Sequence, residues 1–304
     1  MAETIFITGI TGLVGSALAE TLRAQNRSVI GQVRKQTRTG QVQWDLLQRR
    51  PADAKALAGA KLDAVVHLAG DPVFGLWTKE KKRRIHDSRV TGTRNLAEFL
   101  AAMPPQQRPK TLVCASAVGY YGDRGDEVLT ESSVGGEGFL ADTCLKWELA
   151  ADAARTAGIR VVHLRIGIVL TAKGGALKAM LLPFKLGLGG RLGNGKQWMP
   201  WIALDDLIDV ILFALDTADL IGPINAVGPH PVTNAEFSKA LGNALERPAI
   251  LPAPAFALKL LPGGMGQEMF LSSERVVPEV LLKRDFAFQY PTIEHALQHA
   301  LQHG

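Results

Sequence analysis

The segment TGITGLVG at residues 8–15 constrains the fold of this chain more than any other feature. It directly follows a short apolar run, TIFIT at 4–8, and it opens a stretch with helical periodicity, LVGSALAETLRA at 13–24. Three glycines spaced in this way between a strand and a helix are typical of a turn that holds the pyrophosphate of a dinucleotide. The free N–H groups and the positive dipole end at such a helix start attract phosphate.

Each glycine of this segment has its own steric role. Gly9 permits the tight turn, Gly12 lets the backbone approach the pyrophosphate, and Gly15 permits close packing of the helix on the strand. We therefore predict dinucleotide contacts from the turn and the first helical turn, at Gly9, Thr11, Gly12, Leu13, Val14 and Gly15.

The alternation of strand and helix continues through the first half of the chain. Its apolar runs lack strict polar–apolar alternation, as expected for strands buried on both faces. The pattern therefore predicts an α/β fold, a doubly wound parallel sheet (Rossmann) with helices on both faces. The expected strands lie at 4–8, 28–33, 63–70, 111–117 and 159–170, and the expected helices at 13–24, 79–102 and 138–157.

The rhythm changes after about residue 170. A glycine-rich stretch at 187–197 precedes a helix candidate at 205–216 and a further strand candidate at 222–228, and prolines are frequent afterwards. With 304 residues the chain is long enough for two domains. We predict a dinucleotide-binding domain and a smaller, discontinuous C-terminal substrate domain, formed by residues 1–170 with 202–228 and by residues 171–201 with 229–304.

The end of the second strand candidate indicates which dinucleotide binds. NAD sites place Asp or Glu about 20 residues past the glycines, where the carboxylate binds the ribose 2′-hydroxyl. Here the strand ends Val33-Arg34-Lys35, with no carboxylate. A cation at this position pairs with a 2′-phosphate, and arginine offers two parallel contacts. The sequence therefore predicts NADP, with Arg34 and Lys35 at the phosphate.

Composition excludes several classes of protein. Hydrophobic residues make up 47% and charged residues 21%, close to globular averages, so disorder and fibrous architectures are excluded. The two cysteines, Cys114 and Cys144, exclude a disulfide scaffold.

We expect no metal site, because no His/Cys/Asp cluster has metal spacing. We also expect a cytoplasmic protein, since no apolar run approaches ~18 residues and MAETIFITG lacks the basic region of a secretion signal.

The net charge of +5 raises the question of anionic partners. The densest basic run, KEKKRR at 79–84, leads into a stretch with helical spacing. Nucleic-acid binding would favour aromatic residues among these cations, and only Phe74 and Trp77 lie nearby. We interpret the run as a solvated helix face and expect a small-molecule substrate, with no nucleic acid and no membrane as partner.

Several segments together resemble a known superfamily. They are HLAG (67–70), SRVTGTRNL (88–96), ASAVGYYG (115–122), FLADTCLKWE (139–148), LRIGIVL (164–170), LPFKLGLGGRLGNGKQWMPWI (182–202), NAVGPHPVTNAEF (225–237) and RVVPEVLL (275–282). With TGxxGxxG they resemble the extended short-chain dehydrogenase/reductases, and more narrowly their atypical branch called the epimerase family. The resemblance implies an NADP(H)-dependent oxidoreductase or epimerase acting on a hydroxyl or carbonyl. The resemblance also implies that nucleotide-linked compounds are among the possible substrates. It is compatible with a homodimer.

The resemblance also implies further cofactor contacts. Arg34 matches the position that binds the 2′-phosphate. The remaining positions are Asp45 and Leu46 at the adenine edge, Leu68, Ala69 and Gly70 at the ribose and pyrophosphate, Arg89 as a cofactor contact, and Ile168 beside the nicotinamide.

The catalytic residues of the superfamily are only partly present. Its chemistry uses a Ser or Thr together with a Tyr-x-x-x-Lys pair, in which the Lys lowers the pKa of the Tyr. Ser116 supplies the hydroxyl and Lys146 is the lysine candidate, but Asp142 stands four residues before it where Tyr is expected. The usual acid/base residue is therefore missing from its usual place.

Three explanations remain open. Tyr120 or Tyr121 supplies a phenol from the loop after Ser116, Asp142 acts as the acid or base, or the protein binds NADP(H) with little chemistry. The last is a non-catalytic NADPH-binding or redox-sensing protein. If catalysis occurs, we expect Tyr120, Tyr121 or Asp142 to place its polar atom in the nicotinamide cavity.

The glycine-rich stretch at 187–197 is the candidate substrate loop, because glycines let a backbone wrap closely around a ligand. Arg191 and Lys196 are candidates for an anionic group such as a diphosphate, and Gln197 and Trp198 for a base or sugar. The alternative is a loop that crosses between domains with its tryptophans packed in the core.

Overall fold

A seven-stranded parallel sheet forms the centre of the computed structural model, which describes residues 3–35, 38–51, 57 and 59–303. Its strand order is β11-β7-β5-β4-β1-β2-β3, and every pairing is parallel. The predicted doubly wound sheet is confirmed. The strands are β1 (Thr4–Thr8), β2 (Ser28–Val33), β3 (Gln41–Gln43), β4 (Ala64–His67), β5 (Thr111–Ala117), β7 (Arg160–Ile166) and β11 (Gly222–Ala226).

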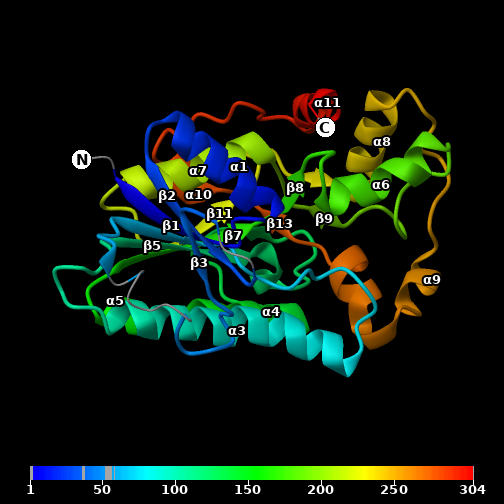
Figure 1. Ribbon diagram of the computed structural model, residues 1–304. Coiled ribbons are helices and arrows are strands. Elements are labelled where there is room, and N and C mark those ends of the chain that lie inside the picture. The colour runs from blue at the N-terminus through cyan, green and yellow to red at the C-terminus, as the bar shows by residue number, and fades with distance from the viewer. Residues whose placement is uncertain (1–2, 36–37, 52–56, 58, 304) are drawn as a thin grey trace.

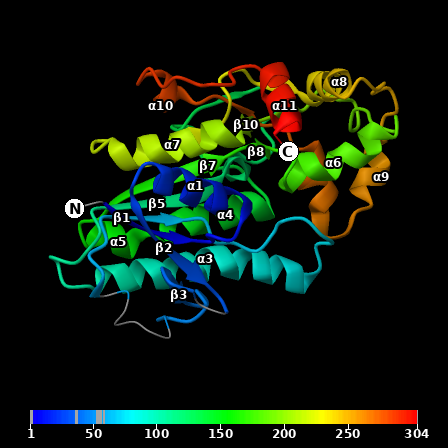
Figure 2. The ribbon, with the colours of Figure 1, turned by 45° about the horizontal axis from the view of Figure 1, so that its top comes forward.

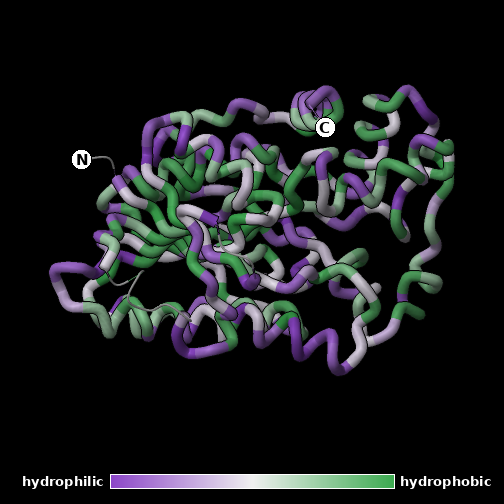
Figure 3. The backbone as a smooth tube through the Cα atoms, in the orientation of Figure 1, coloured by the Kyte–Doolittle hydropathy of each residue, from purple (hydrophilic) through white to green (hydrophobic). Residues whose placement is uncertain are grey.

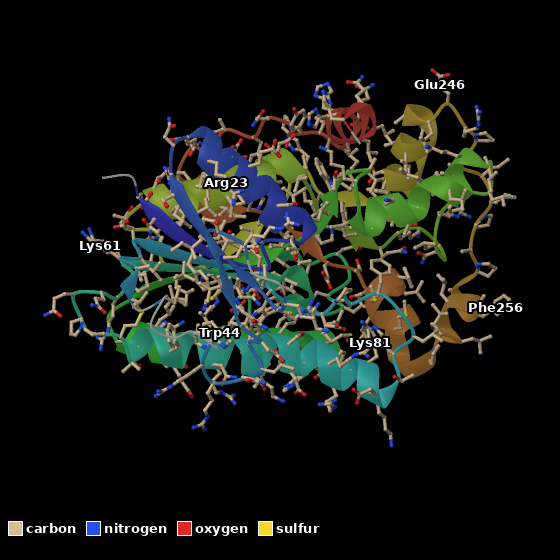
Figure 4. The ribbon with its side chains drawn as sticks, in the orientation of Figure 1. Arg23, Trp44, Lys61, Lys81, Glu246 and Phe256 are labelled. Carbon is tan, nitrogen blue, oxygen red and sulfur yellow. The ribbon has the colours of Figure 1, made fainter. Side chains whose placement is uncertain are left out.

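Helices cover both faces of this sheet (Figures 1 and 2). One face carries α1 (Leu13–Ala24) and α7 (Leu204–Asp216), whose apolar residues form one core cluster with the strands. The other carries α3 (Lys79–Ala101), α4 (Phe139–Leu149) and α5 (Asp152–Thr156). Figure 3 shows the hydrophobic strands at the centre and hydrophilic stretches along α3. Trp44, labelled in Figure 4, packs edge to face on Phe99 of α3, with ring centroids 5.1 Å apart.

The order of the strands fixes where a ligand binds. From β1 the chain runs outward through β2 and β3, and it then returns to place β4 on the other side of β1. In open α/β sheets, ligands bind outside the carboxyl ends of the strands at such a reversal. The carboxyl ends of β1 and β4 are therefore the place to look for a binding site.

The elements within residues 175–185, 234–244 and 255–271 gather at one end of the sheet (Figures 1 and 2), whereas Leu281 joins the core cluster of α1 and α7. Several of the C-terminal elements share a hydrophobic cluster that includes Trp201, Phe237 and Leu297. The predicted domain boundaries stay a prediction. The remaining elements are β6 (Val128–Leu129), β8 (Ile168–Leu170), β9 (Trp198–Met199), β10 (Trp201–Ala203), β12 (Val232–Thr233), β13 (Arg275–Val276), α6 (Gly175–Lys185), α8 (Asn234–Ala244), α9 (Ala255–Lys259), α10 (Glu279–Leu282), α11 (Ile293–Gln302), and the short helical turns η1 (Val118–Tyr121), η2 (Pro262–Gly264) and η3 (Gln267–Leu271).

Two predicted elements are each divided in the structure. The expected strand at 159–170 breaks at Gly167, where β7 stays in the sheet and β8 leaves it to pair with β10. A Cβ on Gly167 would lie 2.8 Å from the Pro200 carbonyl oxygen, so the break needs glycine. The expected helix at 138–157 becomes α4 and α5.

None of the described helices has the length and apolar character needed to span a bilayer.

Candidate functional site

A cavity of about 500 Å³ opens at the carboxyl ends of β1, β2 and β4. We call it the glycine cavity. Most of the residues predicted to bind the dinucleotide line it. These are Gly9, Thr11, Gly12, Arg34, Asp45, Leu46, Leu68, Ala69 and Gly70. The other predicted residues of the same region, Leu13, Val14, Gly15 and Lys35, lie outside the lining.

The glycine turn has no room for side chains on its inner side. The Gly12 N–H donates to the Gly9 carbonyl at 2.9 Å, which closes the turn. Gly9 has a φ of +70°, and a Cβ there would lie 2.9 Å from the Ala69 nitrogen. A Cβ on Gly15 would lie 2.3 Å from the Gly9 oxygen. Gly12 caps α1 without a side-chain hydrogen bond, so the first N–H groups of the helix stay available for an anion.

Buried side chains connect the carboxyl ends of β1 and β4 beside the glycine turn. The His67 ring bonds Thr8 Oγ1 at 2.6 Å through Nδ1 and Thr93 Oγ1 at 2.8 Å through Nε2. Thr8 Oγ1 also accepts from the N–H groups of Leu68 and Ala69. Burial lowers the pKa of His67 to about 4, so the ring is neutral at pH 7. His67 is therefore a structural residue that supports the cavity.

Arginines supply the positive charge of the glycine cavity. Arg34 follows β2 directly and lines the cavity from an exposed position. Arg83 and Arg84 of α3 also line it, although the run that contains them was expected to be a solvated face. Arg83 pairs with Glu80 at 2.8 Å and with Asp87 at 3.1 Å. Sequence reasoning missed these two because only the fold places the start of α3 beside the end of β4.

A second cavity of about 320 Å³ lies at the carboxyl ends of β5 and β7. We call it the apolar cavity. The predicted nicotinamide contact, Ile168, lines it together with Ala117 and Gly167. Other walls come from α4, η3 and the segments that flank β9 and β13.

Arg89 lies where the two cavities meet. It lines the apolar cavity, while its neighbour Ser88 lines the glycine cavity. A Cβ on Gly70 would lie 3.5 Å from the Arg89 guanidinium carbon. The guanidinium donates to the carbonyls of Asp71 at 2.9 Å and Ile85 at 3.2 Å. The arginine thus lies at the predicted boundary between the phosphates and the nicotinamide end of a dinucleotide.

Ser116 does not line the apolar cavity. Its hydroxyl donates to Glu148 Oε1 at 2.8 Å. Glu148 in turn accepts two hydrogen bonds from Arg165, at 2.9 and 3.0 Å. The serine predicted to orient substrate is therefore part of a buried ion-pair network, and Ala117 faces the cavity in its place.

The two tyrosines after Ser116 also belong to this network. Tyr121 is fully buried, accepts from Arg165 at 3.0 Å and lies 2.7 Å from Asn225 Oδ1 as a donor. Burial raises the pKa of its phenol to about 12. The Tyr120 ring lies under the Arg165 guanidinium, whose carbon is 3.5 Å from the ring centroid. Neither tyrosine lines the apolar cavity, and a catalytic role for either stays a prediction.

The structure places Asp142 and Lys146 outside the lining of the apolar cavity, and their catalytic role stays a prediction. The two form an ion pair of 2.7 Å on the outer side of α4, with side chains 54% and 50% exposed. The face of α4 toward the cavity carries Leu140 and, four residues later, Cys144. A Tyr-x-x-x-Lys pair on this face would occupy those two positions, and neither residue present there is a phenol or an amine.

The residues of the predicted substrate loop separate. Gln197 and Trp198 line the apolar cavity. The Gln197 amide is committed to the carbonyls of Leu192 and Phe270, and Trp198 Nε1 donates to Asp126 at 2.8 Å. Lys196 lines a different cavity, and Arg191 is exposed. The expected anion pair of Arg191 and Lys196 therefore does not form in either of the main cavities.

The structure adds polar groups that sequence reasoning missed. Glu268, Ser272 and Glu274 line the apolar cavity from the C-terminal part of the chain, and Thr143 lines it from α4. The Glu268 carboxylate accepts from the N–H groups of Phe139 and Leu140 and so caps α4. No local pattern marks these residues, because the fold brings them to the cavity from far along the chain. Among the described residues, no group of His, Cys, Asp and Glu is arranged to hold a metal.

Known proteins match this chain over nearly its whole length. Residues 5–228 match the model of the NAD dependent epimerase/dehydratase family, and residues 253–300 match a domain of unknown function (DUF1731). The chain is 40% identical to Epimerase family protein Mb2239 of Mycobacterium bovis, over 97% of both chains. It is 34% identical to the human Epimerase family protein SDR39U1, over 97% of this chain and 98% of the relative.

A solved structure agrees with these sequence matches. The crystal structure of human epimerase family protein SDR39U1 (isoform2) with NADPH superposes with a TM-score of 0.87 at 32% identity, covering 98% of this chain and 99% of that one. The family model, these relatives and the glycine turn agree. The chain belongs to the NAD dependent epimerase/dehydratase family.

Proposed function

We propose that the protein binds NADP(H) in the glycine cavity and uses it to oxidise or reduce a hydroxyl or carbonyl group in the apolar cavity. The observation that carries this proposal is the junction of the two cavities at Arg89, along the carboxyl edge of the sheet. A dinucleotide whose phosphates lie at the glycine turn reaches past Arg89 to the ends of β5 and β7.

The residues of the glycine cavity fit this cofactor. Gly12 lines the cavity without a side chain, so its bare backbone can approach a pyrophosphate. Arg34 would pair with the 2′-phosphate, and Asp45 and Leu46 would face the adenine. Leu68, Ala69 and Gly70 would contact the ribose and pyrophosphate. The NADPH in the human relative supports this assignment.

When bound, the nicotinamide supplies or accepts a hydride. Positioning is the main contribution of this chain. Ile168, Ala117 and Gly167 form the wall beside which the reacting carbon of the substrate would lie. The apolar residues around them keep water away from this carbon, which protects a reactive cofactor from side reactions.

One observation favours a second function, a non-catalytic NADPH-binding or redox-sensing protein. Leu140 and Cys144 occupy the cavity face of α4, so neither a phenol nor an amine of this helix faces the cavity at these positions. Burial raises the pKa of the Cys144 thiol to about 12, so it is neutral at pH 7. Rapid mixing of the NADPH-loaded protein with a panel of carbonyl compounds separates the two functions. Cofactor oxidation supports the enzyme, and its absence across the panel supports the binding protein.

Cofactor choice gives the first prediction. The Arg34→Ala protein should bind NADPH about ten- to a hundredfold more weakly, because one charge-assisted phosphate contact is worth about 1.5–3 kcal/mol. Its affinity for NADH should stay nearly the same, since NADH has no 2′-phosphate. Fluorescence titration of both dinucleotides measures the two affinities.

Lys61→Ala is the matched control for this experiment. It removes a positive charge at an exposed position before β4, outside the cavity lining. It should leave the affinity for NADPH within about twofold, because screened surface charges contribute little. Equal losses for NADPH and NADH in Arg34→Ala would contradict the assignment of Arg34 to the phosphate.

A further inference from the structure

We propose that the apolar cavity takes a small uncharged carbonyl compound or alcohol with an apolar body, and that Glu274 moves the proton of the reaction. This inference rests on the proposed function and names the substrate class and the acid/base group of its site.

The walls of the cavity favour an apolar ligand. Aliphatic, aromatic and methionine side chains dominate them, among others Val73, Ile85, Ile166, Met180, Met269 and Phe270. Pockets of this kind bind mainly through apolar contact, and a few polar groups fix the orientation of the ligand. The volume of about 320 Å³ is at the small end of ligand pockets.

Charge argues against a diphosphate in this cavity. Of the described residues that line it, Arg89 alone is a cation, and its guanidinium is engaged with two backbone carbonyls at the boundary to the glycine cavity. Lys196 and Arg191 do not line the cavity. A nucleotide sugar would therefore bury its diphosphate beside apolar walls without a dedicated counter-charge, which is unfavourable.

Two polar groups remain for a substrate oxygen. The amide of Gln197 and the carboxylate of Glu268 are committed to backbone groups. The Thr143 hydroxyl is buried and has no hydrogen-bond partner among the described residues. The Glu274 carboxylate has one side-chain hydrogen bond among the described residues, in which Ser272 Oγ donates to its Oε1 at 3.4 Å. Thr143 and Glu274 can therefore both turn to a ligand.

Glu274 lies in the wall between the apolar cavity and a polar one. The second cavity, of about 300 Å³, contains the exposed carboxylates Asp123 and Glu137 and shares with the first the residues Gly119, Leu140, Glu268, Ser272 and Glu274. A carboxyl group in this wall can exchange a proton with substrate on one side and with water on the other.

The surroundings of Glu274 favour its protonated form. The pKa of Glu274 is raised to about 8, mainly by burial; the Ser272 hydrogen bond lowers it, and the charge of Asp123 contributes to raising it. Five titratable or charged groups border the same two cavities from the packed elements: Asp123 after η1, Glu137 before α4, Glu268 in η3, Cys144 in α4 and Arg89 in α3. At pH 7 the carboxyl group is thus mainly protonated and can donate.

Glu274 is also close to the reacting end of the site. It lines the same cavity as Cys144 of α4, Ala117 at the end of β5, and Ile168. Ile168 is the residue expected beside the nicotinamide.

The step balances for reduction of a carbonyl. The carbonyl π bond breaks while its carbon gains a hydride from NADPH and its oxygen gains the Glu274 proton. NADPH is oxidised to NADP⁺, the carbonyl is reduced to an alcohol, and Glu274 becomes a carboxylate. Water in the polar cavity then returns a proton to it. Oxidation of an alcohol is the reverse, with the carboxylate as base.

The test compares Glu274→Gln with Glu137→Gln, which removes an exposed carboxylate that lines only the polar cavity. With hexanal, cyclohexanone and benzaldehyde as probes, Glu274→Gln should lower kcat about 10²- to 10⁴-fold, as expected for loss of a general acid. Glu137→Gln should stay within about twofold of the parent. Both should bind NADPH as the parent protein does.

The pH profile and a spectrum separate proton transfer from a structural effect. Carbonyl reduction should fall as pH rises through about 8, where Glu274 ionises, and the residual rate of Glu274→Gln should not show this fall. Infrared difference spectra between pH 7 and a pH above about 8 should contain the C=O stretch of the carboxylic acid that is protonated at pH 7. This band should be absent from Glu274→Gln and present in Glu137→Gln, with or without cofactor.

The outcomes distinguish this inference from the proposed function. No binding of NADPH to the parent protein would overturn both. Rates of Glu274→Gln within threefold of the parent, or no protonated carboxyl band, would overturn the role of Glu274 alone. Tighter binding of UDP-glucose than of cyclohexanone to the NADP⁺-loaded protein, or reduction of glyceraldehyde in preference to hexanal, would overturn only the apolar substrate class.

Discussion

The Gly12→Val protein is expected to lose NADP(H) binding while its cofactor-free fold survives. The backbone at Gly12 has φ −79° and ψ 172°, which any residue adopts, so valine causes no backbone strain. Its branched side chain would fill the space through which a pyrophosphate approaches the turn. Two or more charge-assisted hydrogen bonds of about 1.5–3 kcal/mol each would be lost, which weakens binding at least about a hundredfold.

Fluorescence titration with NADPH and thermal unfolding without cofactor together test this expectation. Gly15→Val is the informative comparison, since a Cβ there would lie 2.3 Å from the Gly9 oxygen. It should lower the unfolding temperature of the cofactor-free protein much more than Gly12→Val, whose Cβ would lie 3.1 Å from the same oxygen. Normal uptake of NADPH by Gly12→Val would contradict the assignment of the glycine cavity to the dinucleotide.

The sheet and the glycine turn could be predicted because their signals are local. The apolar runs at 4–8, 28–33 and 111–117 coincide with β1, β2 and β5. Strands buried on both faces need continuous apolar sequence, and a phosphate-binding turn needs glycine at fixed spacing. β3 was not expected, because three residues at the edge of a sheet bear too little apolar sequence to stand out.

The apolar cavity could not be predicted in the same way. Residues on a helix turn by about 100° each, so a displacement of two positions turns a side chain to the opposite face. Lys146 was chosen for its residue type, but Cys144 and Leu140 have the phase that faces the cavity. Glu274 is more distant still, because 130 residues separate it from Cys144 and only the tertiary fold unites them.

The Arg165→Met protein is expected to lose about 3–5 kcal/mol of unfolding free energy. Arg165 and Glu148 have side chains only 4% and 12% exposed, and they form two hydrogen bonds with each other. Removal of the arginine leaves the Glu148 carboxylate buried with Ser116 as its remaining donor. An uncompensated buried charge is what makes such a loss large. Urea denaturation followed by circular dichroism measures it.

Two further variants show whether the charge itself is responsible. In Arg165→Met/Glu148→Leu both charges are gone, so much of the stability should return, because a buried ion pair is often replaceable by apolar residues. Lys146→Met breaks the half-exposed pair with Asp142 and should cost less than about 1 kcal/mol. If Arg165→Met costs no more than Lys146→Met, the buried network does not stabilise the ends of β5 and β7. Ser116 would then be free to turn toward the apolar cavity, and its assignment to a structural role would fail.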